Sequence, residues 1–323
     1  MRGWEFKGTH IPLELVEKPN PVVKPGYVKI KTLAGGLCHS DVSALEHESW
    51  MPSFNIPVIM GHEVAGEIIE FGEGTENQGF KIGDVVAVCP TTSKDGTVNG
   101  YTRDGGYGTM SIHPIETLVK VPDGVSAAQA AASTDAGMTS YHAVVVTGGV
   151  KAGMKVGIIG VGGLGQVAVR IAVVKGCEVY VATRKKEAQQ LALSLGAKEV
   201  SASILDFADK NLDVIIDFAG AGKTTSDAIE AVGFGGKVVI VGMASDYTEI
   251  NTMSMIMKKL TFVGSNGGDN SDIAACLELM AKGELDPIIQ TIDFSQIGEG
   301  IDLLTNGHVN GRIVAVYKEE DYK

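Results

Sequence analysis

The chain lacks the features that mark several large classes of protein. No apolar run approaches the about 20 residues that a membrane-spanning helix needs, and the N-terminus has no signal-peptide core. Only 27 basic residues stand against 39 acidic ones, a formal net charge of −12. That balance argues against a nucleic-acid partner or an anionic membrane surface. We therefore expect a soluble cytoplasmic protein with neither partner.

Cysteine is also scarce, with 4 residues in the chain and no C-x-x-C pair. Their wide spacing excludes the common four-thiolate zinc patterns and does not resemble a disulfide framework. A lone cysteine is by default a small buried apolar residue, and only Cys38 has neighbours that suggest another role. The four are Cys38, Cys89, Cys177 and Cys276.

The 323 residues, 44% of them apolar, suffice for about two domains with their own cores. Residues 1–137 read as short β runs separated by turns, whereas strands and helices alternate from residue 138 onward. Such alternation predicts an α/β domain with a doubly wound parallel sheet and helices on both faces. Residues 267–323 are too few to fold alone. We expect them to complete the first domain, so that 138–266 is inserted in sequence.

The expected elements follow from hydrophobic periodicity and turn signals. A short helix is expected near Ser40–Glu46, and the polar, glycine-rich segment Lys94–Gly108 is expected to be a surface loop. Strands are expected at Tyr27–Thr32, Val64–Phe71, Val85–Val88, Lys155–Ile159, Glu178–Thr183, Val214–Asp217, Lys237–Val241, Leu260–Val263 and Arg312–Tyr317, and helices at Thr139–Val146, Gly163–Val174, Lys186–Leu195, Thr224–Ala231, Met253–Met257 and Ile273–Lys282.

The stretch from Lys155 to Arg170, KVGIIGVGGLGQVAVR, contains G-x-G-x-x-G between a predicted strand and a predicted helix. In a dinucleotide site the first glycine makes the tight turn, the second admits the pyrophosphate, and the third lets helix and strand pack closely. The helix N-terminus attracts the phosphates. The motif predicts cofactor contacts at Gly160, Gly162, Gly163, Leu164 and Gly165. The alternative is a glycine-rich strand-to-helix turn without a ligand.

The end of the next strand indicates which nicotinamide cofactor is used. NAD sites carry an acidic residue about 20 positions after the first glycine, where it binds the ribose 2′-hydroxyl. Here the expected strand ends at Thr183, and Arg184 and Lys185 follow it. Cationic side chains pair with a 2′-phosphate, which a carboxylate would repel. We therefore expect NADP(H); the alternative is a solvated basic helix start.

A second constellation precedes the nucleotide domain. Cys38 lies in GLCHSD and His62 in GHEVAG. Thiolate and imidazole are preferred zinc ligands, and a catalytic zinc has three protein ligands and an open position. A metal-bound histidine usually donates its other N–H to a carboxylate, for which Asp41 and Glu63 are candidates. The alternative is two unrelated core residues.

Taken together, these motifs resemble the zinc-dependent alcohol dehydrogenases of the medium-chain dehydrogenase/reductase superfamily. The match extends over nearly the whole chain and includes GLCHSDV, GHEVAG, GDVVAV, DGGYG, GVGGLG and NGRIVAVY. The resemblance implies a GroES-like catalytic domain of residues 1–137 and 267–323, a Rossmann domain of residues 138–266, and an active site in the cleft between them. It also implies a homodimer or homotetramer that acts on small-molecule alcohols or carbonyl compounds.

The resemblance implies a ligand set for one catalytic zinc per subunit. Cys38 and His62 are the first two ligands. At the third position the best-known members have a cysteine, whereas this chain has Asp135, and similar microbial secondary-alcohol dehydrogenases use an aspartate ligand there. The alternative for Asp135 is a helix N-cap. Glu63 is a further, mobile ligand candidate. The lobe that carries a structural zinc in the family retains only Cys89 here, so we expect no second zinc.

The implied reaction is hydride transfer between NADP(H) and an alcohol, aldehyde or ketone, with secondary alcohols and ketones favoured. Ser40 resembles the residue that takes the alcohol proton; its alternative is a local turn hydrogen bond. Ser43 stands where the family has a histidine that relays the proton onward. In this chain the relay would instead run through the cofactor ribose and water. His39 resembles a residue beside the pyrophosphate, and Trp50 is either a pocket wall or core. Competing functions are a zinc-free quinone or enone reductase of the same superfamily and a non-enzymatic nucleotide-binding protein.

Overall fold

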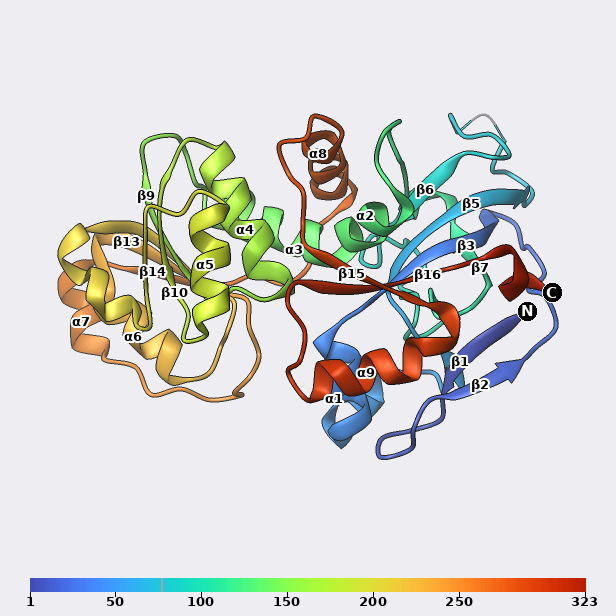
Figure 1. Cartoon of the computed structure of the whole chain (residues 1–323), viewed down its shortest axis with the longest axis horizontal. Coiled ribbons are helices and arrows are strands. Elements are labelled where there is room, and N and C mark those ends of the chain that lie inside the picture. Colours follow the sequence, from blue (N-terminus) through green and yellow to red (C-terminus); the bar gives the residue numbers. More distant parts are fainter. Residues whose placement is uncertain (77) are drawn as a thin grey trace. The chain divides into compact units, whose positions relative to one another are not determined.

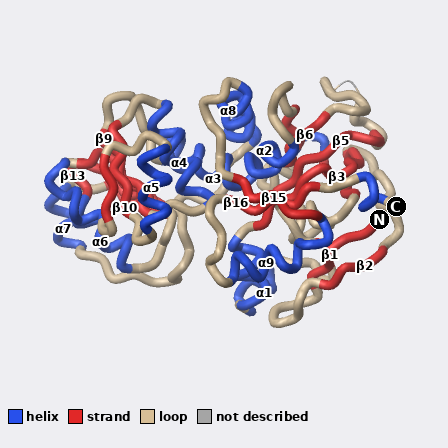
Figure 2. Tube along the Cα trace, in the orientation of Figure 1, coloured by secondary structure: helices blue, strands red, loops and turns tan. Residues whose placement is uncertain are grey.

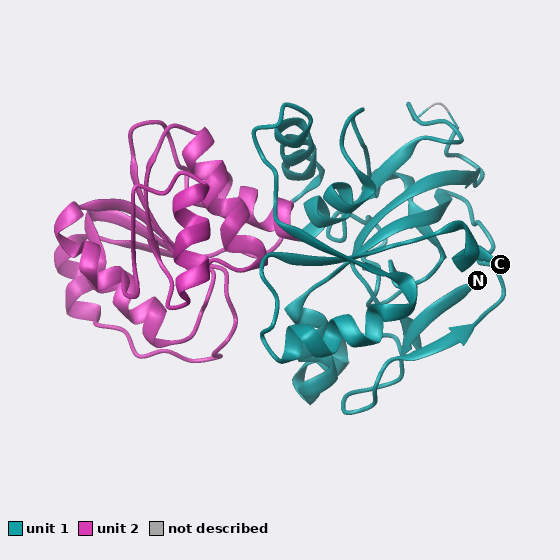
Figure 3. Cartoon of the chain, in the orientation of Figure 1, with its two compact units in different colours: residues 1–135, 269–323 teal, residues 136–268 magenta. Residues whose placement is uncertain are grey.

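The computed structural model describes residues 1–76 and 78–323, which divide into two compact units (Figure 3). Unit 1 comprises Met1–Asp135 and Asp269–Lys323, and unit 2 comprises Ala136–Gly268. The sequence analysis set these boundaries at 137/138 and 266/267. In unit 1, both chain termini lie near each other (Figure 1). No helix among the described residues is long and apolar enough to cross a membrane.

Unit 2 is built on one sheet of six parallel strands in the order β11-β10-β9-β12-β13-β14. Helices pack against the strands (Figure 2): α4 contacts β9 and β10, and α5 contacts β10 and β11. On the other half of the sheet, α6 contacts β12 and β13, and α7 contacts β13. The strand order reverses direction between β9 and β12, so the sheet is doubly wound. The α/β fold class expected from the alternating pattern is therefore confirmed.

Most elements of unit 2 begin and end close to the expected positions. Strand β13 begins at Val232, ahead of the expected Lys237, and the short strand β11 and the 3-10 helix Ile204–Lys210 were not foreseen. The strands and α-helices are β9 Lys155–Ile159, β10 Glu178–Ala182, β11 Glu199–Ser201, β12 Leu212–Asp217, β13 Val232–Ile240, β14 Thr261–Gly264, α3 Met138–Tyr141, α4 Gly163–Val174, α5 Lys186–Ser194, α6 Lys223–Ala231 and α7 Thr252–Lys258. The predicted helix Thr139–Val146 is formed by α3 and a following π-helical turn, His142–Thr147.

Unit 1 contains a seven-stranded sheet in the order β15-β16-β3-β5-β6-β8, with β7 also paired to β3, and a small sheet β2-β1-β4. Strands β15 and β16 are parallel, and the other neighbours in the large sheet are antiparallel. Because β16 pairs with β3, the C-terminal segment shares a sheet with the N-terminal one. This mostly antiparallel unit agrees with the β-rich catalytic domain that the resemblance implies.

The elements of unit 1 include several short ones that periodicity did not indicate. They are β1 Arg2–Phe6, β2 Glu14–Glu17, β3 Tyr27–Leu37, β4 Val58–Ile59, β5 Glu63–Phe71, β6 Val85–Val88, β7 Met110–Pro114, β8 Leu118–Lys120, β15 Ile289–Asp293, β16 Arg312–Val316, α1 His39–Glu46, α2 Ala127–Ala132, α8 Asn270–Ala281 and α9 Ile297–Thr305.

The segment Lys94–Gly108 differs from the surface loop that its composition suggested. Its first residues are exposed, but residues 105–108 are buried and Tyr107 is 0% exposed. The backbone N–H of Gly106 donates to the Gly61 carbonyl at 2.7 Å, and a Cβ on Gly105 would lie 2.1 Å from the same oxygen. The glycines here serve close backbone packing against residues 59–61, so the expectation was wrong for the second half of the segment.

Candidate active site

Three backbone segments of unit 1 carry the predicted metal ligands. Cys38 lies between the end of β3 and the start of α1, and its N–H donates to the Asp41 carboxylate at 3.0 Å. His62 directly precedes β5, and Glu63 is the first residue of that strand. Since β3 and β5 are neighbours, with Gly36 opposite Glu63, the sheet register brings these two segments together.

Asp135 comes from a π-helical turn, Ser133–Gly137, that directly follows α2. Asp135 lies inside this turn, and the N-cap of the following helix α3 is Gly137, so the alternative of Asp135 as a helix N-cap is wrong. The Thr134 hydroxyl accepts a hydrogen bond from the Val64 N–H at 3.2 Å, which fastens the turn to β5. Such π turns occur frequently at functional sites because they redirect a side chain.

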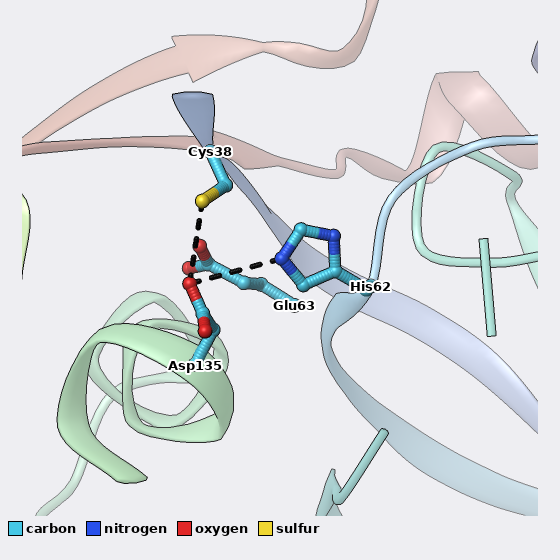
Figure 4. A group of neighbouring side chains, drawn as sticks. All are labelled: Cys38, His62, Glu63 and Asp135. Carbon is cyan, nitrogen blue, oxygen red and sulfur yellow. Dashed lines mark hydrogen bonds and ion pairs between the residues drawn. The ribbon is translucent and has the colours of Figure 1, made fainter. Parts of the chain in front are cut away.

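The ligand atoms of Cys38, His62, Glu63 and Asp135 all lie within 4.8 Å of one another (Figure 4). The Cys38 Sγ is 3.3 Å from the Asp135 Oδ2, and the His62 Nε2 is 3.7 Å from the same oxygen. Donor atoms at zinc bond lengths around a tetrahedral ion are about 3.3–3.6 Å apart. The thiolate, imidazole and carboxylate therefore fit one zinc ion in both donor chemistry and spacing.

Asp41 lies behind His62, on the side away from the other ligands. Its Oδ1 is 3.5 Å from the His62 Nδ1, and its Oδ2 accepts a hydrogen bond from the Tyr107 hydroxyl at 2.6 Å. Asp41 is 0% exposed. Of the two carboxylates considered for this place, Asp41 occupies it and Glu63 does not, since Glu63 belongs to the ligand group itself.

Arg312, the first residue of β16, is a buried cation beside this group that the sequence analysis did not single out. Its guanidinium is 3.1 Å from the Glu63 Oε1 and 3.4 Å from the Asp135 Oδ2. It also donates to the Leu37 carbonyl at 3.1 Å. The closing motif NGRIVAVY contained it, but nothing in that motif distinguishes an inward-facing arginine from a surface one.

Burial and close charges shift the pKa values of these groups. Burial raises the pKa of Glu63 to about 8, although Arg312 opposes the shift. Burial also disfavours the charged form of Asp135, yet His62, Arg312 and Cys38 lower its pKa below the usual range. For His62 burial is outweighed by Tyr101, Asp41 and Asp135, which raise its pKa. Zinc binding at this group would require the neutral form of the His62 imidazole.

Ser40 lies in the first turn of α1, two residues after Cys38. Its Oγ is buried and has no hydrogen-bond partner of normal geometry, so the local turn hydrogen bond considered as its alternative does not form. His39 is exposed. Trp50 is half-buried at the edge of the core cluster that contains Phe6 and Phe54, and its role as a pocket wall stays a prediction.

In unit 2 the glycines of the fingerprint meet the geometric demands of a dinucleotide turn. Gly160 has φ +87°. A Cβ on Gly165 would lie 1.9 Å from the Gly160 carbonyl oxygen, whereas one on Gly162 would meet nothing within 4 Å. The third glycine therefore serves close packing, and the second leaves open space over the N-terminus of α4, which begins at Gly163 and Leu164. This is the cradle that a pyrophosphate requires.

Thr183, Arg184 and Lys185 follow the end of β10 and precede α5. Thr183 is half-buried, and the other two are exposed. Positive charge at a helix N-terminus is unfavourable unless an anion lies beside it. The arrangement is consistent with a phosphate at this position.

Comparison with known proteins gives matches along the whole chain. Residues 24–123 match the alcohol dehydrogenase GroES-like domain, and residues 163–282 match the zinc-binding dehydrogenase domain. An alcohol dehydrogenase of Geobacillus stearothermophilus is 30% identical, with 98% of each chain covered.

Solved structures agree with these sequence matches. The acetophenone reductase of Geotrichum candidum, in complex with NAD, is 30% identical with a TM-score of 0.87 and covers 98% of this chain and 96% of its own. The alcohol dehydrogenase of Aeropyrum pernix is 25% identical, with a TM-score of 0.89. The match covers 98% of this chain and 100% of that one. The chain therefore belongs to the medium-chain, zinc-type alcohol dehydrogenase family.

Proposed function

We propose that this protein is a zinc-dependent oxidoreductase that transfers a hydride between NADP(H) and a small secondary alcohol or ketone. The observation that carries the proposal is the convergence of the Cys38 thiol, the His62 imidazole and the Asp135 carboxylate within metal-ligand spacing. The family supports the reaction class, and the reductase of Geotrichum candidum, by its name, acts on a ketone. Zinc, cofactor choice and substrate class are parts of the proposal.

Cys38, His62 and Asp135 would hold a single catalytic zinc, with Glu63 as a further ligand when it leaves Arg312. Zinc supplies Lewis-acid polarisation of the substrate oxygen. Asp41 keeps the His62 ring oriented with its Nε2 toward the ligand group. Arg312 offsets the negative charge that Glu63 and Asp135 bring to a buried site. We propose no structural zinc, because the lobe at Cys89 offers one thiol.

When bound, the nicotinamide cofactor would supply the hydride that reduces the carbonyl carbon. Ser40 would donate its proton to the substrate oxygen as negative charge develops there, and would regain a proton from water. Its unpartnered, buried Oγ supports this role, since no competing hydrogen bond would have to break.

The cofactor would lie on the turn formed by Gly160, Gly162, Gly163, Leu164 and Gly165. His39 stays a proposed cofactor contact on the strength of the resemblance alone. Thr183, Arg184 and Lys185 would bind the 2′-phosphate of NADP(H). The NAD complex of the Geotrichum enzyme makes NAD(H) the alternative that must be tested directly.

A homodimer or homotetramer is the assembly that the surface of unit 2 supports. Strand β14 is an edge of the six-stranded sheet, and its residue Phe262 is 36% exposed. On the preceding helix α7, Ile256 and Met257 are 70% and 67% exposed. Proteins usually cover an apolar edge strand, and a large exposed apolar patch is typical of an interaction surface. A second copy paired across a two-fold axis would cover both elements at once.

Metal analysis and a substrate panel followed by NADPH absorbance would test the proposal. We expect about one zinc per chain, reduction of simple ketones, and loss of turnover on chelation with recovery on adding zinc. The alternative, a zinc-free quinone or enone reductase, predicts full activity after prolonged chelation and turnover of activated double bonds. Absence of turnover with any alcohol, carbonyl or enone would favour a non-enzymatic role.

A further inference from the structure

Tyr101, a residue that neither the motifs nor the family match assigned, lies against the metal-ligand group of unit 1. Its ring meets the His62 ring edge-on, with centroids 5.6 Å apart. On its other side it stacks on Phe54, at a centroid distance of 4.4 Å and an interplanar angle of 15°. Such paired ring contacts fix the direction in which a phenol points.

The backbone around Tyr101 is tied to the ligand segment. The Tyr101 carbonyl accepts a hydrogen bond from the Asn55 N–H at 2.9 Å. Two residues earlier, the buried Asn99 side chain donates to the His62 carbonyl at 2.8 Å. A Cβ on Gly100 would lie 2.6 Å from the Gly61 backbone. The segment 99–101 therefore packs directly on residues 61–62, and Tyr101 cannot move far without disturbing His62.

The Tyr101 hydroxyl is near the side chain of Ser40 and interacts with it. Even so, the Ser40 Oγ makes no hydrogen bond of normal geometry. Two hydroxyl groups thus lie close together beside the ligand group, and neither satisfies the other. Burial raises the pKa of Tyr101 to about 12, so the phenol remains a neutral donor at physiological pH.

We infer that Tyr101 is a second hydrogen-bond donor to the substrate oxygen, acting beside Ser40. This inference rests on the proposed function, because it requires a substrate oxygen at the ligand group. A ketone oxygen carries only a partial negative charge, whereas the alkoxide oxygen formed by hydride addition carries a full one, and hydrogen bonds to a charged acceptor are stronger. Two hydroxyl donors therefore stabilise the developing alkoxide more than the ketone, and such differential stabilisation raises the rate of the chemical step.

The Tyr101→Phe variant removes only the hydroxyl and keeps both ring contacts. We expect kcat for ketone reduction to fall about 10- to 100-fold, as for loss of a hydrogen bond to a charged oxygen. The KM for the ketone should change less than about threefold, since the ground-state oxygen gains little from the second donor. Tyr322→Phe is the matched control, because the Tyr322 hydroxyl donates to the Thr32 carbonyl, outside the ligand group.

A binding measurement without turnover separates this role from a structural one. Trifluoroethanol, which binds as an acidic alcohol, would be titrated calorimetrically into the enzyme–NADP⁺ complex. We expect Tyr101→Phe to weaken its affinity about tenfold with unchanged zinc content. Unchanged kcat and affinity would overturn the inference, and so would loss of zinc, which would make Tyr101 a structural support for His62. If the unmodified enzyme reduces no carbonyl compound, the proposed function itself has failed.

Discussion

The His62 Nδ1 lies 3.5 Å from the Asp41 Oδ1, and the opposite nitrogen of the same ring faces Asp135 at 3.7 Å. One imidazole thus spans from a buried carboxylate to the ligand group. Asp41 is held in turn by the Tyr107 hydroxyl and the Cys38 N–H. This chain of contacts fixes the ring orientation before any metal binds.

Asp41→Asn is expected to weaken zinc affinity about 10- to 100-fold, because the carboxylate orients His62 and increases its basicity. Competition with a chromophoric chelator measures the affinity. Asp302→Asn, a change on the exposed face of α9, serves as the control. Equal zinc affinity in the two variants would show that Asp41 does not support the His62 ligand.

Asp135→Ala is expected to lose most of the bound zinc and to lower kcat/KM at least about 1,000-fold, since it removes one of three protein ligands. Asp135→Cys should retain zinc, because a thiolate is a preferred ligand for the ion. Zinc content by mass spectrometry and ketone reduction are measured together. Retention of zinc and activity by the alanine variant would show that Asp135 is no ligand.

Arg184→Ala and Lys185→Ala, singly and combined, are expected to lower kcat/KM for NADPH about 10- to 100-fold in total, with little change for NADH. Raising the salt concentration should weaken NADPH binding in the unmodified enzyme and less so in the double variant. Lys198→Ala, which removes an exposed cation paired with Glu178, controls for net charge. A preference of the unmodified enzyme for NADH would refute the assignment.

Asp95 organises the start of the segment Lys94–Gly108. Its carboxylate accepts hydrogen bonds from Ser93, Thr97 and the Tyr27 hydroxyl. Partial burial opposes the shift, but these bonds lower the pKa of Asp95 below its usual range. Because the pKa of Asp95 is lower in the folded state, its ionised form stabilises the protein at pH values above the unfolded pKa of about 3.9. This stabilisation is lost as pH falls below that value and the carboxylate becomes protonated.

Asp95→Asn is accordingly expected to lower Tm by about 2–4 °C at pH 7, and the difference from the unmodified protein should shrink as pH drops below about 4. Thermal unfolding followed by circular dichroism across that range tests the expectation. A constant difference at all pH values would mean that the charge of Asp95 contributes nothing.

Phe262→Lys combined with Ile256→Glu is expected to convert the proposed oligomer into monomers, because charge on an edge strand and its neighbouring helix opposes pairing. Light scattering after size exclusion gives the mass. Leu193→Glu, on the exposed face of α5, is the control for added surface charge. A monomeric unmodified protein would rule out this interface.

The nucleotide-binding unit was predictable because its signals are local. The apolar strands, the helix periodicity and the glycines at 160, 162 and 165 lie in one continuous stretch, and α4 occupies the predicted range of residues. Cys38 and His62 were predicted as ligands from the motifs that contain them, whereas Asp135 was predicted from the family resemblance. No local pattern indicated that Asp135 comes from a π turn or that Thr134 joins this turn to β5 by a hydrogen bond.

The rest of the site depends on contacts between distant segments. Arg312 reaches Glu63 only because β16 pairs with β3, and Tyr107 reaches Asp41 from a segment whose composition is typical of a surface loop. Tyr101 was overlooked for the same reason. Glycine-rich polar sequence indicates either exposure or close backbone packing, and only the fold distinguishes the two.

The central claim is that one zinc held by Cys38, His62 and Asp135 is required for carbonyl reduction. The most direct test is to remove the metal with a chelator, measure zinc and ketone reduction with NADPH, and titrate zinc back. The account predicts that activity disappears with the metal and returns in proportion up to about one zinc per chain. Full activity in metal-free protein would contradict it.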